Sequence, residues 1–325
     1  MIQVNQHDNS EIRTVLLAEI AEQYFIEGKT QAQIARGIGV DRSMVSRWLT
    51  EARKVGIVDI RVNWPVVVDN QLEEKLIDTF DLRGASVVVE QANRPDGLLG
   101  NMGKACSWLL KNHLKEGTTI GIGLGSAIRE VIDELDGRVK PISGVVQLVG
   151  SLGSHNRTLD GHDLVLRTAE KVGGETFFLN APFILENSEL AEALRRNRSI
   201  KETLEKAGDC DLALVGIGNI EHEKEIYLEA GYMQPRDLEY LASEDVVGEV
   251  CGLHFTLHGE IVAEEYEKRL ITVDKETLLE IPERIGVAGG LAKIEAILGA
   301  LRGKLVNILV TDYLVAEELL RVGAV

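Results

Sequence analysis

The sequence predicts an α/β protein that carries a small helical domain at its amino-terminal end. Apolar side chains in the first 60 residues recur at helical spacing, whereas short apolar strands alternate with amphipathic helices from residue 85 onward. At roughly 100–200 residues per domain, the length of 325 residues suggests two domains, or one large domain with an appendage. We place the domains at 1–64 and 65–325, because Trp64-Pro65 breaks the pattern between them.

Three helices and a short strand are predicted within the first domain. Apolar residues recur at helical spacing over 12–27 and 42–55. Between these segments, Thr30 and Gln33 form a capping box that opens a shorter helix. The alternation over 57–62 predicts a short strand, which makes the domain winged in type.

The segment 30–49 has the residue spacing of a helix-turn-helix. Ala35 is small where the two helices must cross closely, and Gly39 allows the left-handed backbone of a tight turn. Three apolar positions then complete the wedge between the helices: Val40, Val45, and Trp48 or Leu49.

Polar side chains on the opposite face of the third helix are the candidate DNA contacts. The N-terminal end of a recognition helix enters the major groove, where Arg pairs with guanine and Ser bonds bases or phosphates. The candidates are Arg42, Ser43, Ser46 and Arg47, together with Thr30 and Gln31 at the start of the preceding helix. The alternative is a generic helical hairpin with solvated arginines.

The charge distribution is compatible with a nucleic-acid partner although the formal net charge is −17. Residues 29–61 carry seven basic side chains and three acidic ones, whereas residues 65–325 carry 27 basic and 44 acidic side chains. Phosphate binding depends on local Lys and Arg. The sequence therefore describes a locally basic module on an acidic body.

Composition excludes several other classes of protein. Hydrophobic residues make up 45% and charged residues 27%, which is ordinary globular usage. No apolar run approaches the ~20 residues of a membrane span, and the N-terminus does not resemble a secretory signal. Three widely spaced cysteines suggest neither disulfides nor a metal module. We expect a cytoplasmic protein without a metal or a cofactor.

The second domain is predicted to be a doubly wound parallel sheet, because its strands are apolar on both faces and alternate with helices. The predicted strands are 86–89, 119–122, 145–149, 176–179, 212–215, 250–256, 284–287 and 306–310. The predicted helices are 71–80, 96–115, 126–135, 160–172, 188–206, 290–301 and 312–321.

Glycines that follow the apolar strands indicate a ligand cleft. Gly123, Gly125 and Ser126 lie where a strand opens into a helix, so N–H groups and the helix dipole could hold a phosphate. Gly150 also lies just beyond a strand, at the edge where open parallel sheets bind ligands. The alternative is that these glycines form tight connections.

Several segments resemble bacterial sugar-responsive transcription regulators of the sorbitol-operon (SorC) family. They include TQAQIARGIGVDRSMVSRWLTEARKVGIVDIRV, IGIGLGSAIREVIDEL, VVQLVGSLG, ASEDVVGEVCG and RIGVAGGLAKIEAILGALRGKLVNILVTD, in the order of that family. The resemblance covers essentially the whole chain. It implies an effector domain similar to sugar-phosphate isomerases and glucosamine-phosphate deaminases, which binds a phosphorylated sugar without turning it over.

The resemblance also implies roles for single residues. Glu249 in VGEVCG would bond sugar hydroxyls, and Lys293 in AGGLAK would bind a phosphate or carboxylate. Asp163, in a sequence similar to the Asp-Gly-His of the deaminases, is expected to face the cleft. Where relatives often have Trp-Gly-x-Thr, this chain has Leu-Gly-Ser-Ala at 124–127, with Ala127 in place of the threonine. A free sugar or polyol therefore stays open as the effector.

The predicted function is a DNA-binding transcription regulator of a carbohydrate operon, controlled by a sugar or sugar phosphate. The alternatives are a sugar-phosphate isomerase or deaminase with an appended DNA-binding domain, and a constitutive DNA-binding structural protein. The expected partners are a palindromic operator, the effector, and further copies of the chain in a dimer or tetramer. No catalytic residue is assigned.

Overall fold

The structure is a computed structural model that describes residues 6–59, 65–90, 97–135, 142–152, 160–220, 228 and 233–323. The chain divides into two compact units, Met1–Pro65 and Val66–Val325. Across the described ranges, we find no helix with the length and apolar character that a membrane span requires.

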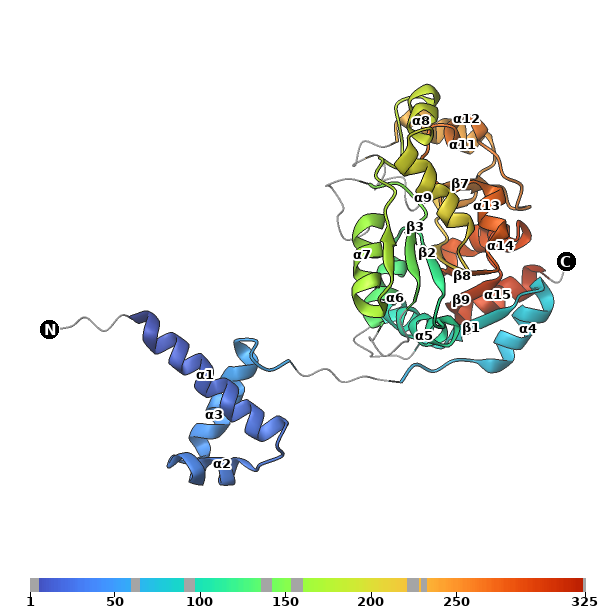
Figure 1. Ribbon diagram of the computed structural model, residues 1–325. Coiled ribbons are helices and arrows are strands. Elements are labelled where there is room, and N and C mark those ends of the chain that lie inside the picture. The colour runs from blue at the N-terminus through green and yellow to red at the C-terminus, as the bar shows by residue number, and fades with distance from the viewer. Residues whose placement is uncertain are drawn as a thin grey trace. The chain divides into compact units, whose positions relative to one another are not determined.

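The first unit contains the three predicted helices, which are α1 (Gln6–Phe25), α2 (Gln31–Ile38) and α3 (Arg42–Lys54) (Figure 1). The first helix begins earlier than the predicted residue 12. Residues 57–59 form no strand, and the rest of the strand expected over 57–62 lies outside the described residues.

The second unit is built on a seven-stranded parallel sheet with the order β1-β9-β8-β5-β2-β3-β4. The strands are β1 (Gly84–Val88), β2 (Thr119–Ile122), β3 (Gly144–Gln147), β4 (Glu175–Phe177), β5 (Leu212–Gly216), β8 (Glu283–Val287) and β9 (Ile308–Asp312). This confirms the predicted doubly wound α/β class.

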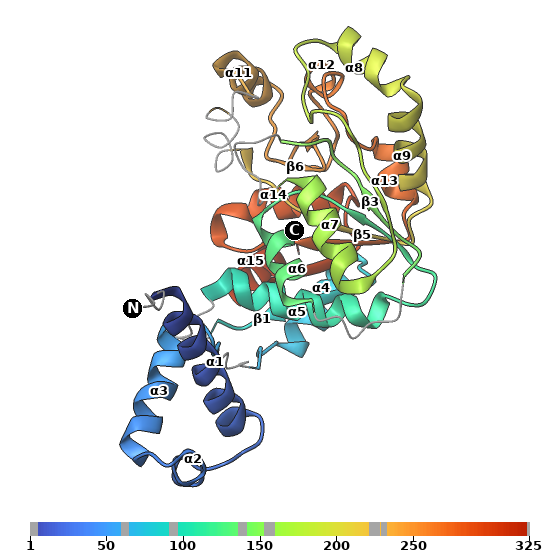
Figure 2. The same cartoon turned by 60° about the vertical axis from the view of Figure 1, so that its left-hand side comes forward.

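Helices cover both faces of the sheet (Figure 2). One face packs against α5 (Gly97–His113), α6 (Ser126–Glu134) and α7 (Gly161–Val172). The other packs against α4 (Asn70–Phe80), α9 (Arg198–Gly208), α14 (Ile294–Arg302) and α15 (Tyr313–Gly323). The described residues also form α8 (Ser188–Arg195), α11 (Pro235–Ser243), α12 (Glu264–Glu267), α13 (Lys275–Glu280) and the short 3-10 helix η2 (Leu291–Lys293).

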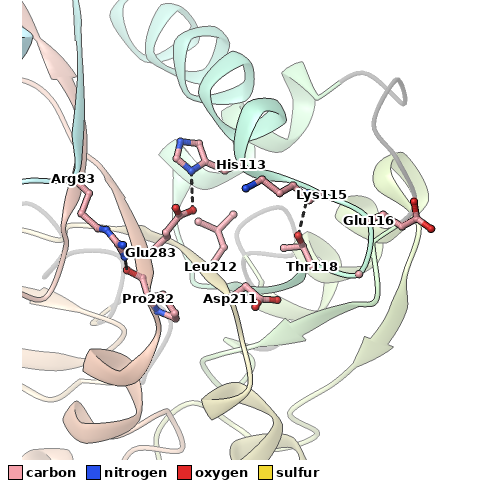
Figure 3. Close-up of a pocket in the computed structure, with 10 residues that line it drawn as sticks. Arg83, His113, Lys115, Glu116, Thr118, Asp211, Leu212, Pro282 and Glu283 are labelled. Carbon is pink, nitrogen blue, oxygen red and sulfur yellow. Dashed lines mark hydrogen bonds and ion pairs between the residues drawn. The ribbon is translucent and has the colours of Figure 1, made fainter.

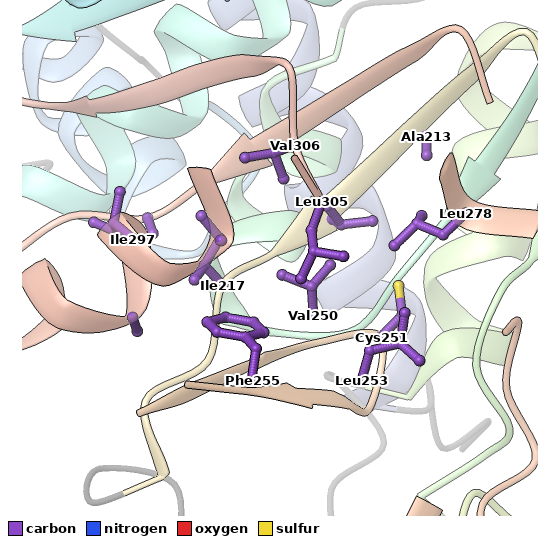
Figure 4. Packing of buried hydrophobic residues seen from close by; sticks show 14 of the residues in the cluster. Ala213, Ile217, Val250, Cys251, Leu253, Phe255, Leu278, Ile297, Leu305 and Val306 are labelled. Atoms are coloured by element: carbon purple, nitrogen blue, oxygen red, sulfur yellow. The ribbon is translucent and has the colours of Figure 1, made fainter. Parts of the chain in front are cut away.

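Alternate residues of each central strand enter different cores, as the period of two requires. In β5, Leu212 and Leu214 join the cluster beneath α5–α7, whereas Ala213 and Val215 join the cluster on the opposite face. Figure 4 shows part of the second cluster, where Ala213 lies among apolar side chains from several other segments. Burial on both faces explains why these strands are apolar throughout.

The prediction of a single strand over 250–256 was wrong. The chain instead forms an antiparallel hairpin of β6 (Gly248–Val250) and β7 (Leu253–Phe255), separate from the parallel sheet. At its turn, Cys251 and Gly252 both have positive φ, 53° and 78°, as a two-residue hairpin turn requires. The helix predicted over 188–206 is two helices, α8 and α9, and α11, α12 and α13 were not predicted.

Candidate functional sites

The turn between α2 and α3 forms as the sequence predicted. Thr30 caps α2, because its hydroxyl accepts the Gln33 N–H at 3.3 Å while the Gln33 side chain accepts the Thr30 N–H at 2.9 Å. Gly39 ends the helix with φ 71°, a left-handed conformation that glycine adopts readily. Ala35 is buried in the apolar cluster that α2 and α3 share. The helix-turn-helix spacing therefore has its expected geometry.

The third helix buries one face and exposes another. Val45 and Leu49 are buried in the core of the first unit, whereas Trp48 is only partly buried. Leu49 thus completes the wedge between the helices. The N-terminal half of the other face exposes four polar side chains, Arg42, Ser43, Ser46 and Arg47. Thr30 is exposed and Gln31 half-buried at the start of α2.

Contacts with α1 hold the far end of α3 in place. The Arg13 Nε donates to Glu51 Oε1 at 2.9 Å, and the Arg53 guanidinium lies 5.4 Å from the centroid of the Phe25 ring. Arg53 is therefore engaged inside the first unit. Lys54, the other basic residue in the last turn, is exposed.

The strand order of the second unit reverses between β2 and β5. From β2 the chain adds β3 and β4 on one side and then adds β5, β8 and β9 on the other. The register sets Ile122 at the end of β2 beside Leu214 of β5 and Gln147 of β3. Ligands of open parallel sheets bind outside the carboxyl ends at such a reversal. The loops after β2 and β5 are therefore the candidate effector site.

The loop from β2 to α6 offers an uncapped helix N-terminus. The Gly123 N–H donates to the Leu214 carbonyl at 2.9 Å, which fixes the start of the loop against β5. Gly125 is the N-cap with φ 121° and ψ 163°, and it supplies no side-chain cap. Ser126 is exposed and Ala127 half-buried in the first turn of α6. The N–H groups in the first turn of a helix have no acceptor within the helix, and together with the helix dipole they favour a bound anion here.

Glu249 reaches the same edge through the β6–β7 hairpin. Its backbone pairs with Gly218 in the loop after β5, with N–H to carbonyl distances of 2.9 and 3.1 Å in the two directions. Its Oε2 accepts the Gly252 N–H at 2.6 Å, which orients the carboxylate across the turn. The hairpin therefore places Glu249 beside the strand-order reversal.

Lys293 meets that loop from the other side. It ends η2, and its Nζ donates to the Ile217 carbonyl at 2.8 Å. The neighbouring Asn219 side chain donates to the Ala292 carbonyl, so two contacts join the loops after β5 and β8. Glu249 and Lys293 thus contact two consecutive residues of the loop after β5, Gly218 and Ile217.

Two other predicted effector residues have different neighbours. The Gly150 N–H donates to the Ile271 carbonyl at 2.8 Å, so the segment that follows β3 is paired with the segment around Ile271. Asp163 on α7 lies 3.8 Å from Arg167, which in turn contacts Asp133 of α6. The structure does not bring these two residues to the loop after β5.

Asp312 is a site residue that the sequence reasoning missed. Its carboxylate ends β9, is 4% exposed, accepts the Gly290 N–H at 2.6 Å, and accepts the Val315 N–H at 3.1 Å. It therefore shapes the loop that leads to Lys293. An acidic residue that ends an apolar strand and precedes a helix was the signal that could have found it.

The three cysteines and His254 lie buried in the core. All three cysteines are buried, and burial raises the pKa of the Cys210 thiol to about 12 and that of the other two further. His254 is buried in β7, and burial lowers its pKa to about 4. In the described ranges, no group of three His, Cys, Asp or Glu side chains could hold a metal ion.

A cavity of about 420 Å³ lies at the opposite, amino-terminal edge of the sheet (Figure 3). The His113 ring nitrogen and the Glu283 carboxylate lie 2.7 Å apart there, and Arg83 donates to the Pro282 carbonyl at 2.6 Å. None of the predicted effector residues lines this cavity.

A helix-turn-helix unit is followed by a doubly wound domain with a candidate ligand site at the carboxyl edge of its sheet. This combination defines the class of two-domain, ligand-responsive DNA-binding proteins. A family described as "Putative sugar-binding domain" matches residues 65–321. The chain belongs to this family and to the SorC family of sugar-binding bacterial transcription regulators.

Individual relatives agree with this assignment. The chain is 29% identical to the sorbitol operon regulator of Klebsiella pneumoniae, over 94% of this chain and 98% of that protein. It is 28% identical to the transcriptional regulator LsrR of Enterobacter sp. strain 638, over 94% of this chain and 92% of the relative. The crystal structure of full-length SorC from Klebsiella pneumoniae matches with a TM-score of 0.72 and 28% identity, over 94% of this chain and 99% of that one.

Proposed function

We propose that the chain is a transcription regulator of a carbohydrate operon and that a small sugar or sugar phosphate controls its affinity for the operator. The main support for this proposal is the amphipathic character of α3. One face of the helix is buried, and the other exposes Arg and Ser side chains near the N-terminal end. The names of the relatives, a sorbitol operon regulator and a transcriptional regulator, support it.

The proposed DNA contacts are the exposed polar residues of the helix-turn-helix. Arg42, Ser43, Ser46 and Arg47 enter the major groove on α3 and read base edges. Thr30 and Gln31, at the start of α2, contribute further contacts.

The proposed effector site is the carboxyl edge around the loops after β2, β5 and β8. Glu249 accepts hydroxyl groups, and Lys293 with the first turn of α6, including Ser126 and Ala127, receives an anionic group. Gly123 and Gly125 let the backbone approach the ligand. Gly150 and Asp163 are retained as candidates on the rim of the same edge.

The effector is proposed to be bound and released unchanged. A buried thiol with a raised pKa is a poor nucleophile, and a buried neutral imidazole in β7 is a poor proton carrier at this edge. The rival function, an isomerase or deaminase, requires turnover. Incubating the purified chain with sugar phosphates and analysing the products tests it, since catalytic conversion would favour the rival.

Assembly follows from the geometry of DNA reading. One helix-turn-helix covers half a site, so useful affinity requires at least a dimer on a palindrome. Because the protein outside the basic segment is acidic, DNA repels the body of the chain, which weakens the binding of a single reading head. We propose a dimer at least, with a tetramer of two such dimers as the SorC resemblance implies, acting in the cytoplasm where the operator lies.

The connection between the two units is short enough to transmit a change. Val67 accepts the Val89 N–H at 2.8 Å and Asp69 donates to Val87, so the chain is anchored to the second unit from Val67 onward. Twelve residues, 55–66, separate this anchor from α3, which ends at Lys54. A ligand regulates by binding one arrangement of the heads better than another.

Titration of an operator duplex with and without effector tests the proposal. The duplex comes from binding-site selection on random DNA, and the effector from a thermal-shift screen of sugars and sugar phosphates. With a coupling of about 1–3 kcal/mol, operator affinity should change roughly 5–150-fold. An operator affinity that no screened ligand alters would favour a constitutive DNA-binding protein.

A further inference from the structure

A second cavity, of about 600 Å³, lies between α9, α12, α13 and the β6–β7 hairpin, and we call it the α12–α13 cavity. Its size is in the range of roughly 300–1,000 Å³ that small-molecule sites occupy. None of the predicted effector residues lines it. The turn residue Gly252 does, which places the hairpin between this cavity and the effector loops.

The lining suits a neutral ligand with hydroxyl groups. Leu204, Leu253 and Ile261 supply apolar wall, and three basic side chains face four acidic ones. The lining therefore has no excess of positive charge that would attract a phosphate ester. Glu267 is the one acid of the four that is not exposed: its side chain is 19% exposed, and its Oε1 accepts the His254 N–H at 2.7 Å. Lys275 provides an ammonium on α13.

The cavity is linked to the effector site by direct contacts with the hairpin. The Gly252 N–H, at the cavity wall, is held by Glu249 Oε2 at 2.6 Å. His254, which Glu267 holds through its N–H, pairs directly with Glu249 in the hairpin register. Thr272, also at the wall, donates to the Cys251 carbonyl at 2.6 Å. A molecule that presses on this wall therefore acts on the residues that orient Glu249.

We propose that the α12–α13 cavity is a second binding site, that its ligand is an unphosphorylated polyol, and that the ligand alters effector binding through the hairpin turn. Polyol hydroxyls donate to the Glu267 carboxylate and accept from Lys275, while the C–H groups of the ligand cover Leu253 and Ile261. The coupling to the effector rests on the proposed function, whereas the binding site itself does not.

Calorimetric titration of the full chain with mannitol, ribitol and glucose, each also as its phosphate ester, tests the site. We expect at least one free polyol to bind. Glu267→Gln and Lys275→Ala should each weaken that binding roughly tenfold or more, because the first replaces a charged acceptor with a neutral one and the second removes a charged donor. Ile261→Trp should abolish it by filling the cavity.

Two control variants separate this site from the rest of the molecule. Glu205→Gln, in an exposed pair with Lys201 on α9, should bind the polyol like the parent. Lys293→Ala should also bind it like the parent, since Lys293 lies outside the cavity. Thermal unfolding of every variant confirms that it is folded.

The outcomes distinguish the cavity from the proposed function. If no free polyol binds, or if Glu267→Gln, Lys275→Ala and Ile261→Trp all bind it like the parent, the cavity assignment is overturned. Loss of polyol binding in Lys293→Ala would also overturn it, because the polyol would then occupy the effector site. A polyol that binds through Glu267 but leaves effector affinity unchanged overturns the coupling alone. A chain that binds no operator refutes the proposed function and leaves the cavity result standing.

Discussion

Replacing Asp312 tests whether the effector loops are held as the structure shows. The carboxylate is almost fully buried and accepts two backbone N–H groups, one from Gly290 in the loop after β8 and one from Val315 in α15. Asp312→Ala removes both acceptors at once. The Gly290 loop then loses the contact that fixes its path toward Lys293.

The expected cost follows from the two orphaned donors. A buried N–H left without an acceptor costs about 1–3 kcal/mol. Asp312→Ala should therefore destabilise the second unit by about 2–4 kcal/mol, whereas Asp312→Asn, which keeps one acceptor oxygen, should cost about half as much. For a unit of this size, such a loss lowers the melting temperature by about 5–15 °C.

Thermal unfolding of the full-length variants, followed by circular dichroism, measures this cost. Asp209→Ala is the matched control, because Asp209 is 71% exposed and its pair with Lys206 at 3.3 Å contributes little. Folded Asp312→Ala should also respond more weakly to the effector, because Lys293 is displaced. An Asp312→Ala protein that melts with the parent would refute the assigned role of the carboxylate.

Three further predictions concern the reading head, the effector site and pH. Arg47→Ala should cost about 1–3 kcal/mol on the operator and relax one base position, whereas Lys54→Ala should reduce the salt slope by about one; binding-site selection that returns the parental motif for Arg47→Ala would contradict this. Glu249→Ala and Lys293→Ala should abolish the effector response in operator titrations while ligand-free DNA binding stays at the parental level, and a parental response in both would show that the site is misplaced. Burial raises the pKa of Glu267 from 4.5 to about 7, so folding favours the protonated side chain. The resulting stabilisation of the folded state is complete below about pH 4.5 and is lost as the pH rises through about 7. Glu267→Gln should gain in melting temperature over the parent across that interval, and a constant difference would contradict the assignment.

Signals from neighbouring residues in the chain were enough to predict the three helices of the first unit, but the strand expected over 57–62 is absent from residues 57–59. The Thr30–Gln33 capping box, the left-handed Gly39 and the buried Val45 each depend on residues a few positions apart. The strands of the sheet were equally clear, because strands buried on both faces are continuously apolar. Even the β2 boundaries came out as predicted, at Thr119–Ile122.

Pairings between distant segments were not predictable from the same signals. The apolar pattern over 250–256 does not show that Cys251 and Gly252 turn the chain, because a cysteine rarely adopts positive φ. Glu249 came from a family resemblance, and its pairing with Gly218 depends on tertiary packing. Asp312 was missed because, although its contact with Val315 is local, its other partner, Gly290, becomes a neighbour only when β8 and β9 pair.

In the proposed coupling, the β6–β7 hairpin is the element through which a polyol in the α12–α13 cavity acts on the effector site. It pairs with the loop after β5 through Glu249, and its turn carbonyl at Cys251 is held by Thr272 on the opposite side. The parallel sheet beneath it is buried on both faces, so its strands have little freedom to move without disturbing two cores. The hairpin lies outside that sheet and turns through two residues with positive φ. Because Val250 and Phe255 bury the hairpin in the same core, substitutions should alter the effector response through the polar contacts that Glu249 and Cys251 make at the hairpin's edge and turn.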